Sequence, residues 1–490
     1  MNKIKYIFLI LILILTACTS TSNSDNTPAS PIAPTGVLFP PSDSTPLPTR
    51  PAFKPAELVA YTAQTGDTLP ALAARFNTTV DEILSANTFI PRDATTMPAG
   101  MPMQIPIYYR ALWGTPFQSI PDQAFINSPT SSGFNTEAFV QSQNGWWKNY
   151  SAYVGGRTRT GAELVDYVAM NYSISPRLLL AILEYQGGAL TKEEPPVSRK
   201  LLGLDRLFWE SHYLQLVLAA NELNNGYYGW RQGSLLEFED ASGNLFRPDP
   251  WQNAGSVALQ YYFSRMMSAD EFSQAIGSSG LAKTYVSLFG NPWDDPFELI
   301  PGSLTQPELL LPFPKSQTWS YTGGPHTGWG TGEPLAALDF APPSEKSGCT
   351  SAKPENYVVA VADGLVVRSS TNEGVVLDLD KDGDERTGWV IYYLHLATNQ
   401  RAVVGLNLNA GDLIGYPSCE GGRSTGTHVH VARKYNGEWI LADSAIPFVL
   451  SGWTAHSGSA EYLGTLTKGN ATVIACECGD EFTSVNAEYP

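Results

Sequence analysis

Hydrophobic and polar positions repeat with different periods along the chain and predict different kinds of folded region. Residues 61–69 form a short apolar strand and a turn, apolar positions follow at helical spacing up to residue 84, and residues 100–106 form a second strand. This order predicts a small β-α-α-β module. Helical spacing also dominates residues 108–311, in the stretches 162–171, 176–185, 214–224, 251–267 and 270–288. We therefore expect a mainly α-helical middle domain.

The region after residue 312 has a different pattern. Short apolar runs, several of them alternating, cover residues 357–362, 365–369, 374–379 and 389–396 and are separated by Gly, Asn and Asp. Many short strands with such turns are typical of an antiparallel β domain. The predicted fold class is thus multidomain: the β-α-α-β module (56–107), the helical middle domain (108–311), an antiparallel β domain (312–455) and a C-terminal tail (456–490).

The first 55 residues resemble a targeting segment. The nine-residue apolar run 7–15 is too short for a helix across a bilayer, which needs about 20 residues, but suits the core of a signal peptide. Leu15-Thr-Ala-Cys18 resembles the bacterial lipobox, which implies a signal peptide (1–17), lipidated Cys18 and anchoring to a membrane of the cell envelope, outside the cytoplasm. The alternative is an ordinary secretory signal. Residues 18–55 contain nine prolines and predict an extended tether.

Composition and charge restrict the functions that remain. A chain of 490 residues exceeds one ordinary hydrophobic core, which agrees with several domains. Hydrophobic residues make up 43% of the chain, which excludes a wholly disordered protein. The 47 acidic residues outnumber the 30 basic ones, and the net charge is −17. We expect no nucleic-acid partner, because phosphate binding needs an excess of Lys and Arg. Nothing in the sequence indicates an oligomeric state.

Histidine is scarce, with six in the chain, yet His428 and His430 lie two positions apart in an apolar run. In a strand, residues i and i+2 face the same side, so both imidazoles would point the same way. If the histidines were placed at random, roughly 0.07 pairs at this spacing would be expected, so chance is a poor explanation for the pair. With His326 and Asp339, they offer the nitrogen and oxygen ligands that zinc takes in catalytic sites. The alternative is histidines packed in a β core or a closed structural site.

Residues 319–450 resemble the lysostaphin-like (β-lytic and staphylolytic) zinc metallopeptidases, on the residues His326, Asp339, Tyr-Leu-His395-Leu and His428-x-His430. The resemblance implies that His326, Asp339 and His430 bind one Zn²⁺ per chain and that His395 and His428 are catalytic. Asp339 follows His326 by 13 positions, as in the β-lytic-type subgroup. All five positions are filled, so we expect a working enzyme.

The substrate class implied by this resemblance is the peptide part of peptidoglycan, hydrolysed by an endopeptidase. One of His395 and His428 would assist proton removal from water, and the other would stabilise the oxyanion or protonate the leaving amine. Two alternatives stay open. The chain could be a non-catalytic wall-binding lipoprotein that regulates another hydrolase, or a bifunctional enzyme whose middle domain also cleaves glycan strands.

The module at 56–107 resembles a LysM domain, on the turn Gly66-Asp-Thr-Leu69, Ala73-x-x-Phe76, Asn87 and Ile105-Pro106. The resemblance implies binding to glycans that contain N-acetylglucosamine, here peptidoglycan. The groove would lie between the first turn and the loop that leads from the second helix to the second strand. Gly66, Asp67, Thr68 and Ile90 are therefore candidate glycan-binding residues. A LysM fold used only as a spacer is the alternative.

A candidate acid lies in the middle domain. Residues 174–184 look like the helix that delivers the catalytic glutamate in lysozyme-like lytic transglycosylases, where burial raises the pKa of that carboxyl. Glu184 would be this acid. The sequence departs from that family, since Tyr185-Gln-Gly187 replaces the usual serine and no clear glycine-rich segment follows. The alternative is a structural helical domain with Glu184 at an exposed helix end.

The cysteines allow two pairings. Cys349 and Cys419 both lie in the predicted β domain, and in an exported protein we expect a disulfide that joins the loops around the site. Two free thiols are the alternative. Cys476 and Cys478 are separated by one residue, and a local disulfide is favoured over a second metal site because no histidine lies nearby in the sequence.

Overall fold

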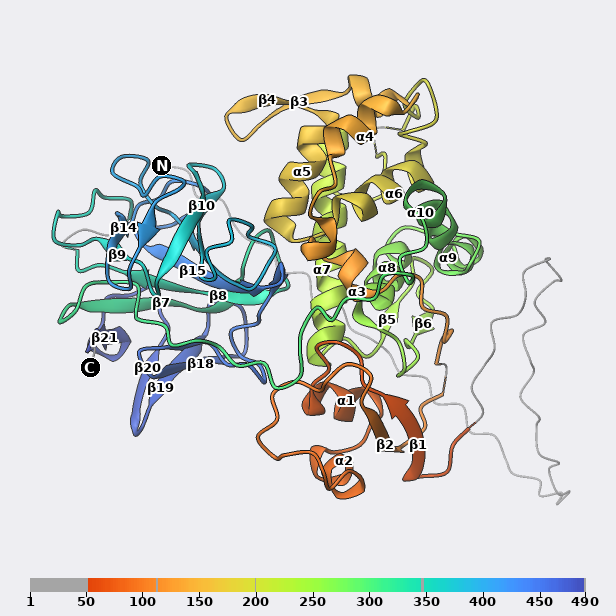
Figure 1. The fold of residues 1–490 in the computed structure, drawn as a ribbon, viewed down its shortest axis with the longest axis horizontal. Coiled ribbons are helices and arrows are strands. Elements are labelled where there is room, and N and C mark those ends of the chain that lie inside the picture. The colour runs from red at the N-terminus through yellow and green to blue at the C-terminus, as the bar shows by residue number, and fades with distance from the viewer. Residues whose placement is uncertain (1–51, 112, 199, 345–347, 489–490) are drawn as a thin grey trace, which may run out of the picture. The chain divides into compact units, whose positions relative to one another are not determined.

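The computed structural model describes residues 52–111, 113–198, 200–344 and 348–488 (Figure 1). The predicted signal peptide, the predicted lipidation site Cys18 and residues 18–51 of the tether lie outside the described residues. Every element named below belongs to one compact unit of the chain. Within the described ranges, no helix is long and apolar enough to cross a membrane.

The first module has the predicted β-α-α-β order. It consists of β1 (Glu57–Thr62), α1 (Leu69–Arg75), α2 (Val80–Ala86) and β2 (Pro102–Ile107). The two strands pair antiparallel, and both helices contribute apolar side chains to one core with them. Each helix begins at a threonine: the Thr68 side chain accepts a hydrogen bond from the backbone of Ala71, and Thr79 forms a capping box with Glu82.

The middle region is mainly helical, as predicted. Its helices are α3 (Asp122–Phe125), α4 (Thr136–Ser142), α5 (Gly161–Tyr172), α6 (Pro176–Gly187), α7 (His212–Gln232), α8 (Ala254–Ser264), α9 (Ala269–Ile276) and α10 (Leu281–Phe289). Two hairpins accompany them: β3 (Ser151–Val154) with β4 (Arg157–Thr160), and β5 (Phe238–Glu239) with β6 (Leu245–Phe246). The one helix expected over 270–288 is interrupted between α9 and α10. There a Cβ at Gly280 would lie 2.3 Å from the carbonyl oxygen of Ala275, so the turn requires glycine.

A nine-stranded antiparallel sheet forms the predicted β domain, in the order β13-β10-β11-β12-β15-β8-β7-β21, with β16 paired to β15. The strands are β7 (Thr318–Thr327), β8 (Leu335–Ala341), β10 (Gly364–Ser370), β11 (Gly374–Asp378), β12 (Trp389–Leu394), β13 (Asn407–Leu408), β15 (Val429–Tyr435), β16 (Glu438–Trp439) and β21 (Ser484–Asn486). Smaller sheets pair β9 (Val358–Val359) with β14 (Leu413–Gly415), and join β17 (Val449–Leu450), β18 (Trp453–Ser457), β19 (Gly464–Lys468) and β20 (Ala471–Ile474).

Residues expected to form a C-terminal tail belong to this β structure. β19 and β20 extend the four-stranded sheet, and β21 pairs with β7 at the edge of the main sheet. The pattern of the sequence missed these strands because they are short and their apolar positions are few.

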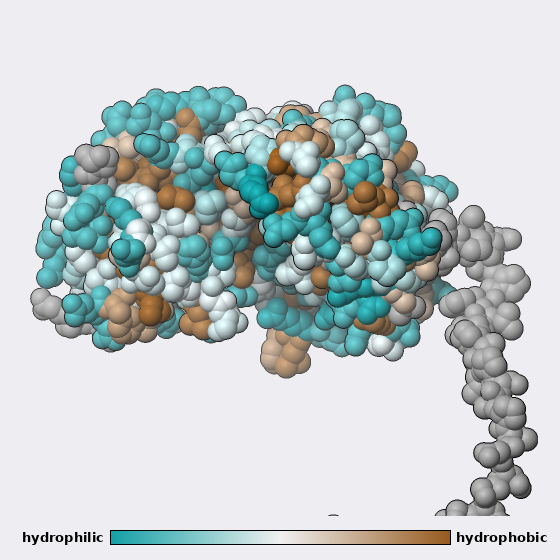
Figure 2. Space-filling model, turned by 90° about the horizontal axis from the view of Figure 1, so that it is seen from below, coloured by the Kyte–Doolittle hydropathy of each residue, from teal (hydrophilic) through white to brown (hydrophobic). Residues whose placement is uncertain are grey.

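Both faces of the main sheet are covered. Tyr392 and Ala432 belong to the core that also contains the helices of the middle region, whereas Tyr393 and Val431 belong to a second core on the other face. His430 has the same parity on β15 as Ala432, so it lies on the face toward the middle region. On the face of the molecule drawn in Figure 2, hydrophobic residues occur in separate small groups among hydrophilic ones, since most large apolar side chains are in the cores.

Candidate metal centre

Strand pairing brings the predicted ligands together. His430 on β15 lies directly opposite Asp339 on β8, and His326 on β7 lies opposite Ala337, two positions from Asp339 on β8. Residues that face each other across antiparallel strands have Cβ atoms about 5 Å apart, which suits side chains that share one ligand. The register of three neighbouring strands therefore builds this group.

The ligand atoms converge closely. The distance from Asp339 Oδ1 to His326 Nε2 is 3.3 Å, and that to His430 Nδ1 is 3.4 Å. The two imidazole nitrogens are 3.0 Å apart. All three residues are buried, with exposures of 2%, 7% and 5% for His326, Asp339 and His430. We call His326, Asp339 and His430 the metal-ligand group.

The chemistry of this group fits a cation. Asp339 Oδ1 is buried and accepts no hydrogen bond from any residue that the structure describes, although it faces the two imidazole nitrogens. A buried carboxylate oxygen without a hydrogen-bond donor is costly unless an ion or another charge compensates it. Two imidazole nitrogens and one carboxylate oxygen are ligands that zinc takes in catalytic sites, with one position left for water.

Backbone carbonyls orient both imidazoles. His326 Nδ1 is 2.8 Å from the carbonyl oxygen of Gly324, and His430 Nε2 is 3.3 Å from that of Gly328. Because a carbonyl only accepts, these nitrogens carry the protons. In its neutral form each imidazole therefore presents an unprotonated nitrogen, His326 Nε2 or His430 Nδ1, toward Asp339, and these are the tautomers that metal binding requires.

His395 and His428 lie beside this group. Their ring centroids are 4.5 Å apart, and His395 follows β12 directly, whereas His428 precedes β15. His395 Nδ1 is 2.9 Å from the Glu420 carbonyl oxygen, and His428 Nδ1 is 2.7 Å from that of Gly426. Neither carbonyl contacts an Nε2 atom, and His428 Nε2 lies 3.6 Å from Asp339 Oδ2. The structure thus brings all five residues singled out from the sequence into one site.

Burial and neighbouring charges set the protonation of the site. Burial raises the pKa of the Asp339 carboxyl, but the nearby His326 and His428 outweigh it and hold that pKa well below its usual range. Burial, together with His428 and His430, lowers the pKa of the His395 imidazole to about 3. His395 is therefore neutral, and Asp339 ionised, at neutral pH.

Tyr462 belongs to the site but was not found from the sequence. Its ring stacks on the imidazole of His326, with centroids 4.2 Å apart and planes at 22°. The backbone of Tyr462 holds this position: its carbonyl oxygen accepts from the amide of Gly324, and its own amide donates to the Pro325 carbonyl. Tyr462 lies between β18 and β19, in the region expected to be a tail, and no local motif marks it.

The long loop between His326 and Asp339 rests on helix α7. The side-chain oxygen of Asn221 accepts from the amide of Thr331, and that of Asn225 accepts from the amide of Glu333, both at 2.9 Å. The Glu333 carboxylate also accepts from Gln232 at 2.6 Å. Side chains of the middle region therefore fix the loop that separates two of the candidate ligands.

Two disulfides are present. Cys349 and Cys419 form the predicted pair, and Glu420, which follows Cys419, supplies the carbonyl that His395 contacts. The disulfide thus holds a loop that positions a candidate catalytic residue. Cys476 and Cys478 pair with each other, in agreement with the local disulfide that we favoured over a second metal site.

The four candidate glycan-binding residues take part in the fold of the first module. Gly66 has φ +73° and lies against the guanidinium of Arg231, where a Cβ would be 2.7 Å from Cζ. Asp67 is 1% exposed and pairs with Arg75 at 2.8 Å, Thr68 caps α1, and Ile90 is 7% exposed. Gly66, Asp67 and Thr68 belong to the loop between β1 and α1, and Ile90 lies in the loop between α2 and β2.

Glu184 lies near the C-terminal end of α6. One carboxylate oxygen accepts from the backbone amide of Leu190 at 2.7 Å, and the other accepts from the Thr191 hydroxyl at 2.6 Å. Both oxygens thus fasten the chain that follows the helix. This arrangement agrees with a structural role for Glu184.

The antiparallel sheet, the two imidazoles and carboxylate on its adjacent strands, and the two further histidines define a metallopeptidase of the lysostaphin-like fold. Residues 345–441 match peptidase family M23, residues 118–303 match the N-terminal domain of LasA, and residues 61–106 match the LysM domain. The chain is 32% identical over 162 residues to the Beta-lytic metalloendopeptidase of Lysobacter enzymogenes, over 31% of this chain and 82% of that protein. The chain therefore belongs to peptidase family M23.

Further relatives extend over more of the chain. Protease LasA of Pseudomonas aeruginosa is 25% identical over 345 residues, which cover 66% of this chain and 75% of LasA. Among solved structures, the M23 metalloprotease pseudoalterin from the deep sea covers 35% of this chain and 96% of its own, at 24% identity and a TM-score of 0.29. The match to family M23 contains His395, His428 and His430, whereas His326 and Asp339 precede it.

Proposed function

We propose that this M23 metalloendopeptidase uses one zinc ion, held by His326, Asp339 and His430, to hydrolyse peptide bonds of peptidoglycan. The observation that supports the metal is the buried Asp339 Oδ1, which faces two imidazole nitrogens and accepts no hydrogen bond from the residues described. The substrate class is supported by the relationship to Beta-lytic metalloendopeptidase and by the LysM module on the same chain.

The proposed reaction divides work between the ion and the two remaining histidines. His326, Asp339 and His430 would hold the zinc ion, which would supply Lewis-acid chemistry: a lowered pKa for a water molecule and polarisation of the scissile carbonyl. One of His395 and His428 would take the proton of the attacking water at Nε2, and the other would stabilise the oxyanion or protonate the leaving amine. His395 is buried, whereas 14% of the His428 side chain is exposed.

We further propose that the enzyme works in the cell envelope, outside the cytoplasm. Lipidated Cys18 would anchor it to a membrane, and residues 18–55 would act as the tether. The LysM-like module would direct it to peptidoglycan glycan through the face formed by the loops β1–α1 and α2–β2. The lipobox-like sequence and the LysM match support this targeting.

Digestion of purified sacculi tests the activity. Full-length protein should release fragments with new amino termini, and treatment with a chelator should abolish the release until zinc is restored. New reducing sugar ends would instead support cleavage of glycan strands. The absence of any product from the zinc-loaded protein would favour a non-catalytic wall-binding protein and contradict the proposed function.

A further inference from the structure

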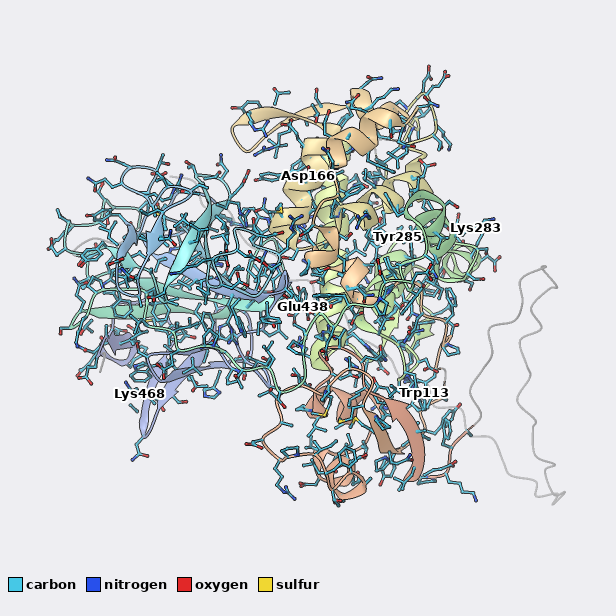
Figure 3. The ribbon with its side chains drawn as sticks, in the orientation of Figure 1. Trp113, Asp166, Lys283, Tyr285, Glu438 and Lys468 are labelled. Carbon is cyan, nitrogen blue, oxygen red and sulfur yellow. A yellow bond between two sulfur atoms is a disulfide. The ribbon has the colours of Figure 1, made fainter. Side chains whose placement is uncertain are left out.

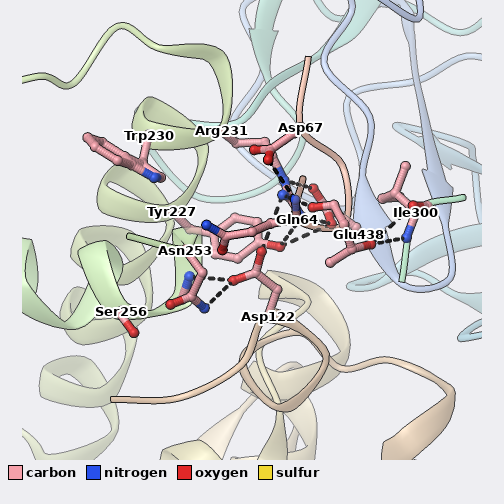
Figure 4. Close-up of polar contacts among 12 residues, drawn as sticks. Gln64, Asp67, Asp122, Tyr227, Trp230, Arg231, Asn253, Ser256, Ile300 and Glu438 are labelled. Carbon is pink, nitrogen blue, oxygen red and sulfur yellow. Dashed lines mark hydrogen bonds and ion pairs between the residues drawn. The ribbon is translucent and has the colours of Figure 1, made fainter. Parts of the chain in front are cut away.

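A segment of the chain itself lies against the LysM-like module. Residues 298–304, which we call the linker segment, follow α10 and lead toward β7. The amide of Ile300 donates to the Thr65 hydroxyl at 2.7 Å, and that hydroxyl donates back to the Ile300 carbonyl at 3.1 Å (Figure 4). Thr65 belongs to the loop between β1 and α1, so the linker segment is fastened to the first of the two loops.

The linker segment also contacts the second loop, between α2 and β2. The Thr96 hydroxyl donates to the Pro301 carbonyl at 2.7 Å and accepts from the amide of Leu304 at 3.0 Å. The Thr96 carbonyl accepts from the amide of Ser303 at 2.9 Å. Ile300 and Leu304 are 2% and 8% exposed, so the contact is a buried one. The linker segment therefore joins the two loops.

A charged contact holds the first loop from another side. The guanidinium of Arg231, on α7, donates to the Thr65 carbonyl and to both carboxylate oxygens of Glu438, at 2.8 and 2.9 Å. It also pairs with Asp122 at 3.2 Å. Figure 3 places Glu438 between the β domain and α7. We call Arg231, Glu438, Asp122 and Thr65 the Arg231 junction; it connects the first loop to both other regions (Figure 4).

The hydrogen-bonding groups of this face are already in use. Each hydroxyl of Thr65 and Thr96 has one proton, and each proton is donated to the linker segment. A glycan seated between the same two loops would meet the linker segment there and would find both hydroxyl protons already donated. We propose that the linker segment occupies the glycan-binding face of the LysM-like module, so that glycan and linker segment compete for it. This inference rests on the glycan targeting in the proposed function.

Competition has a quantitative consequence. The apparent affinity for glycan is reduced by the fraction of molecules in which the face is free. By linkage, bound glycan shifts the linker segment toward the released state by the same factor.

Gly302 allows the contact to be weakened without a change in the LysM-like module. A Cβ on Gly302 would lie 2.4 Å from Cγ and 2.8 Å from Cα of Pro98. The φ angle of Gly302 is not in the positive range that favours glycine. Alanine there therefore meets the second loop but suffers no backbone strain. Gly479 is a matched control, because no atom beyond its neighbours lies within 4 Å of its Cβ position and it too lacks positive φ.

The test measures binding of tetra-N-acetylchitotetraose to the full chain by calorimetry. Gly302→Ala should bind at least tenfold more tightly than the unsubstituted protein, and Gly479→Ala should bind as the unsubstituted protein does. Equal affinity in Gly302→Ala, or no binding by any of the proteins, overturns the proposal.

Hydrogen exchange in the unsubstituted protein gives a second reading that does not depend on a variant. Saturating saccharide should accelerate exchange of the amides of Ile300, Ser303 and Leu304, whereas unchanged or slower exchange contradicts competition. Sacculus digestion with the same proteins reports on the peptidase separately. If the zinc-loaded unsubstituted protein digests no sacculi while Gly302→Ala still binds saccharide more tightly, the proposed peptidase alone is refuted.

Discussion

Two buried polar clusters of this chain, the metal-ligand group and the Arg231 junction, satisfy their charged atoms in different ways. In the junction, the Arg231 guanidinium binds two carboxylates and a backbone carbonyl. Each of the three charged side chains is at most 9% exposed. In the metal-ligand group, a carboxylate oxygen faces two imidazoles and accepts no hydrogen bond within the described part of the chain. In the first cluster the chain itself supplies the cation: Asp122 Oδ2, which like Asp339 Oδ1 accepts no hydrogen bond from the described residues, lies 3.2 Å from the Arg231 guanidinium. In the second, the carboxylate oxygen faces two imidazole nitrogens instead, an arrangement that suits a metal ion.

The largest expected effect is removal of one ligand from the metal-ligand group. His430→Ala should lose bound zinc and reduce kcat/KM on the order of 10³-fold or more, since the ion supplies several kcal/mol of transition-state stabilisation. Zinc content and release of amino termini from sacculi measure the two effects. His456→Ala is the control, because His456 bonds only to Thr467 outside the site, and it should keep both. Full activity in His430→Ala would refute the ligand assignment.

A smaller loss is expected from a catalytic histidine. His428→Ala should retain about one zinc per chain but lose roughly 10²–10⁴-fold in kcat, the range typical of general acid–base catalysis. Metal analysis of the same preparation separates this variant from His430→Ala. If His428→Ala lost its zinc as fully as His430→Ala, the division between ligand and catalytic histidines would be wrong.

The Arg231 junction should respond in stability. Arg231→Met leaves Glu438 and Asp122 buried without their cation, which we expect to lower the free energy of unfolding by about 3–5 kcal/mol. Urea denaturation measures it, and Arg92→Met, which removes an exposed pair with Asp81, should leave stability unchanged. The double variant Arg231→Met/Glu438→Leu should recover part of the loss. A single variant as stable as the unsubstituted protein would show that the junction does not hold the regions together.

Lys434 offers a contrast to Arg231, since burial lowers the pKa of this lysine to about 7. Its ammonium lies 4.1 Å above the Trp439 ring and donates to the Met170 carbonyl at 3.2 Å. Between pH 7 and the unfolded pKa near 10.4, the unfolded chain binds the extra proton, so stability rises with pH by up to about 1.4 kcal/mol per unit. Unfolding at pH 7.5 and pH 9 measures this. Lys434→Met should flatten the rise, and an unaltered slope would contradict a buried neutral lysine.

The sequence allowed correct structural predictions where the spacing of residues close together in the chain determines the structure. His428 and His430 are two apart on one strand, so their common face could be predicted from the period of a strand alone. The helices of the first module were predictable for the same reason, because their apolar spacing is local; their threonine caps became evident only in the structure. The convergence of His326 and Asp339 came from a family resemblance, since register between strands is not readable from one strand.

Contacts between segments far apart in the chain could not be predicted from local spacing. Tyr462 reaches His326 only because the loop after β18 bonds to Gly324 and Pro325. The docking of the linker segment depends on backbone groups of residues 300–304, which any sequence possesses. The break between α9 and α10 followed from a close backbone approach at Gly280, which apolar periodicity does not reveal.

Anomalous diffraction at the zinc edge, from crystals of the purified full chain, tests the central claim most directly. We expect one peak within bonding distance of His326 Nε2, Asp339 Oδ1 and His430 Nδ1, at about 2.0–2.2 Å from each. A zinc peak held by other residues, or zinc-loaded protein with no peak between these three side chains, would contradict it.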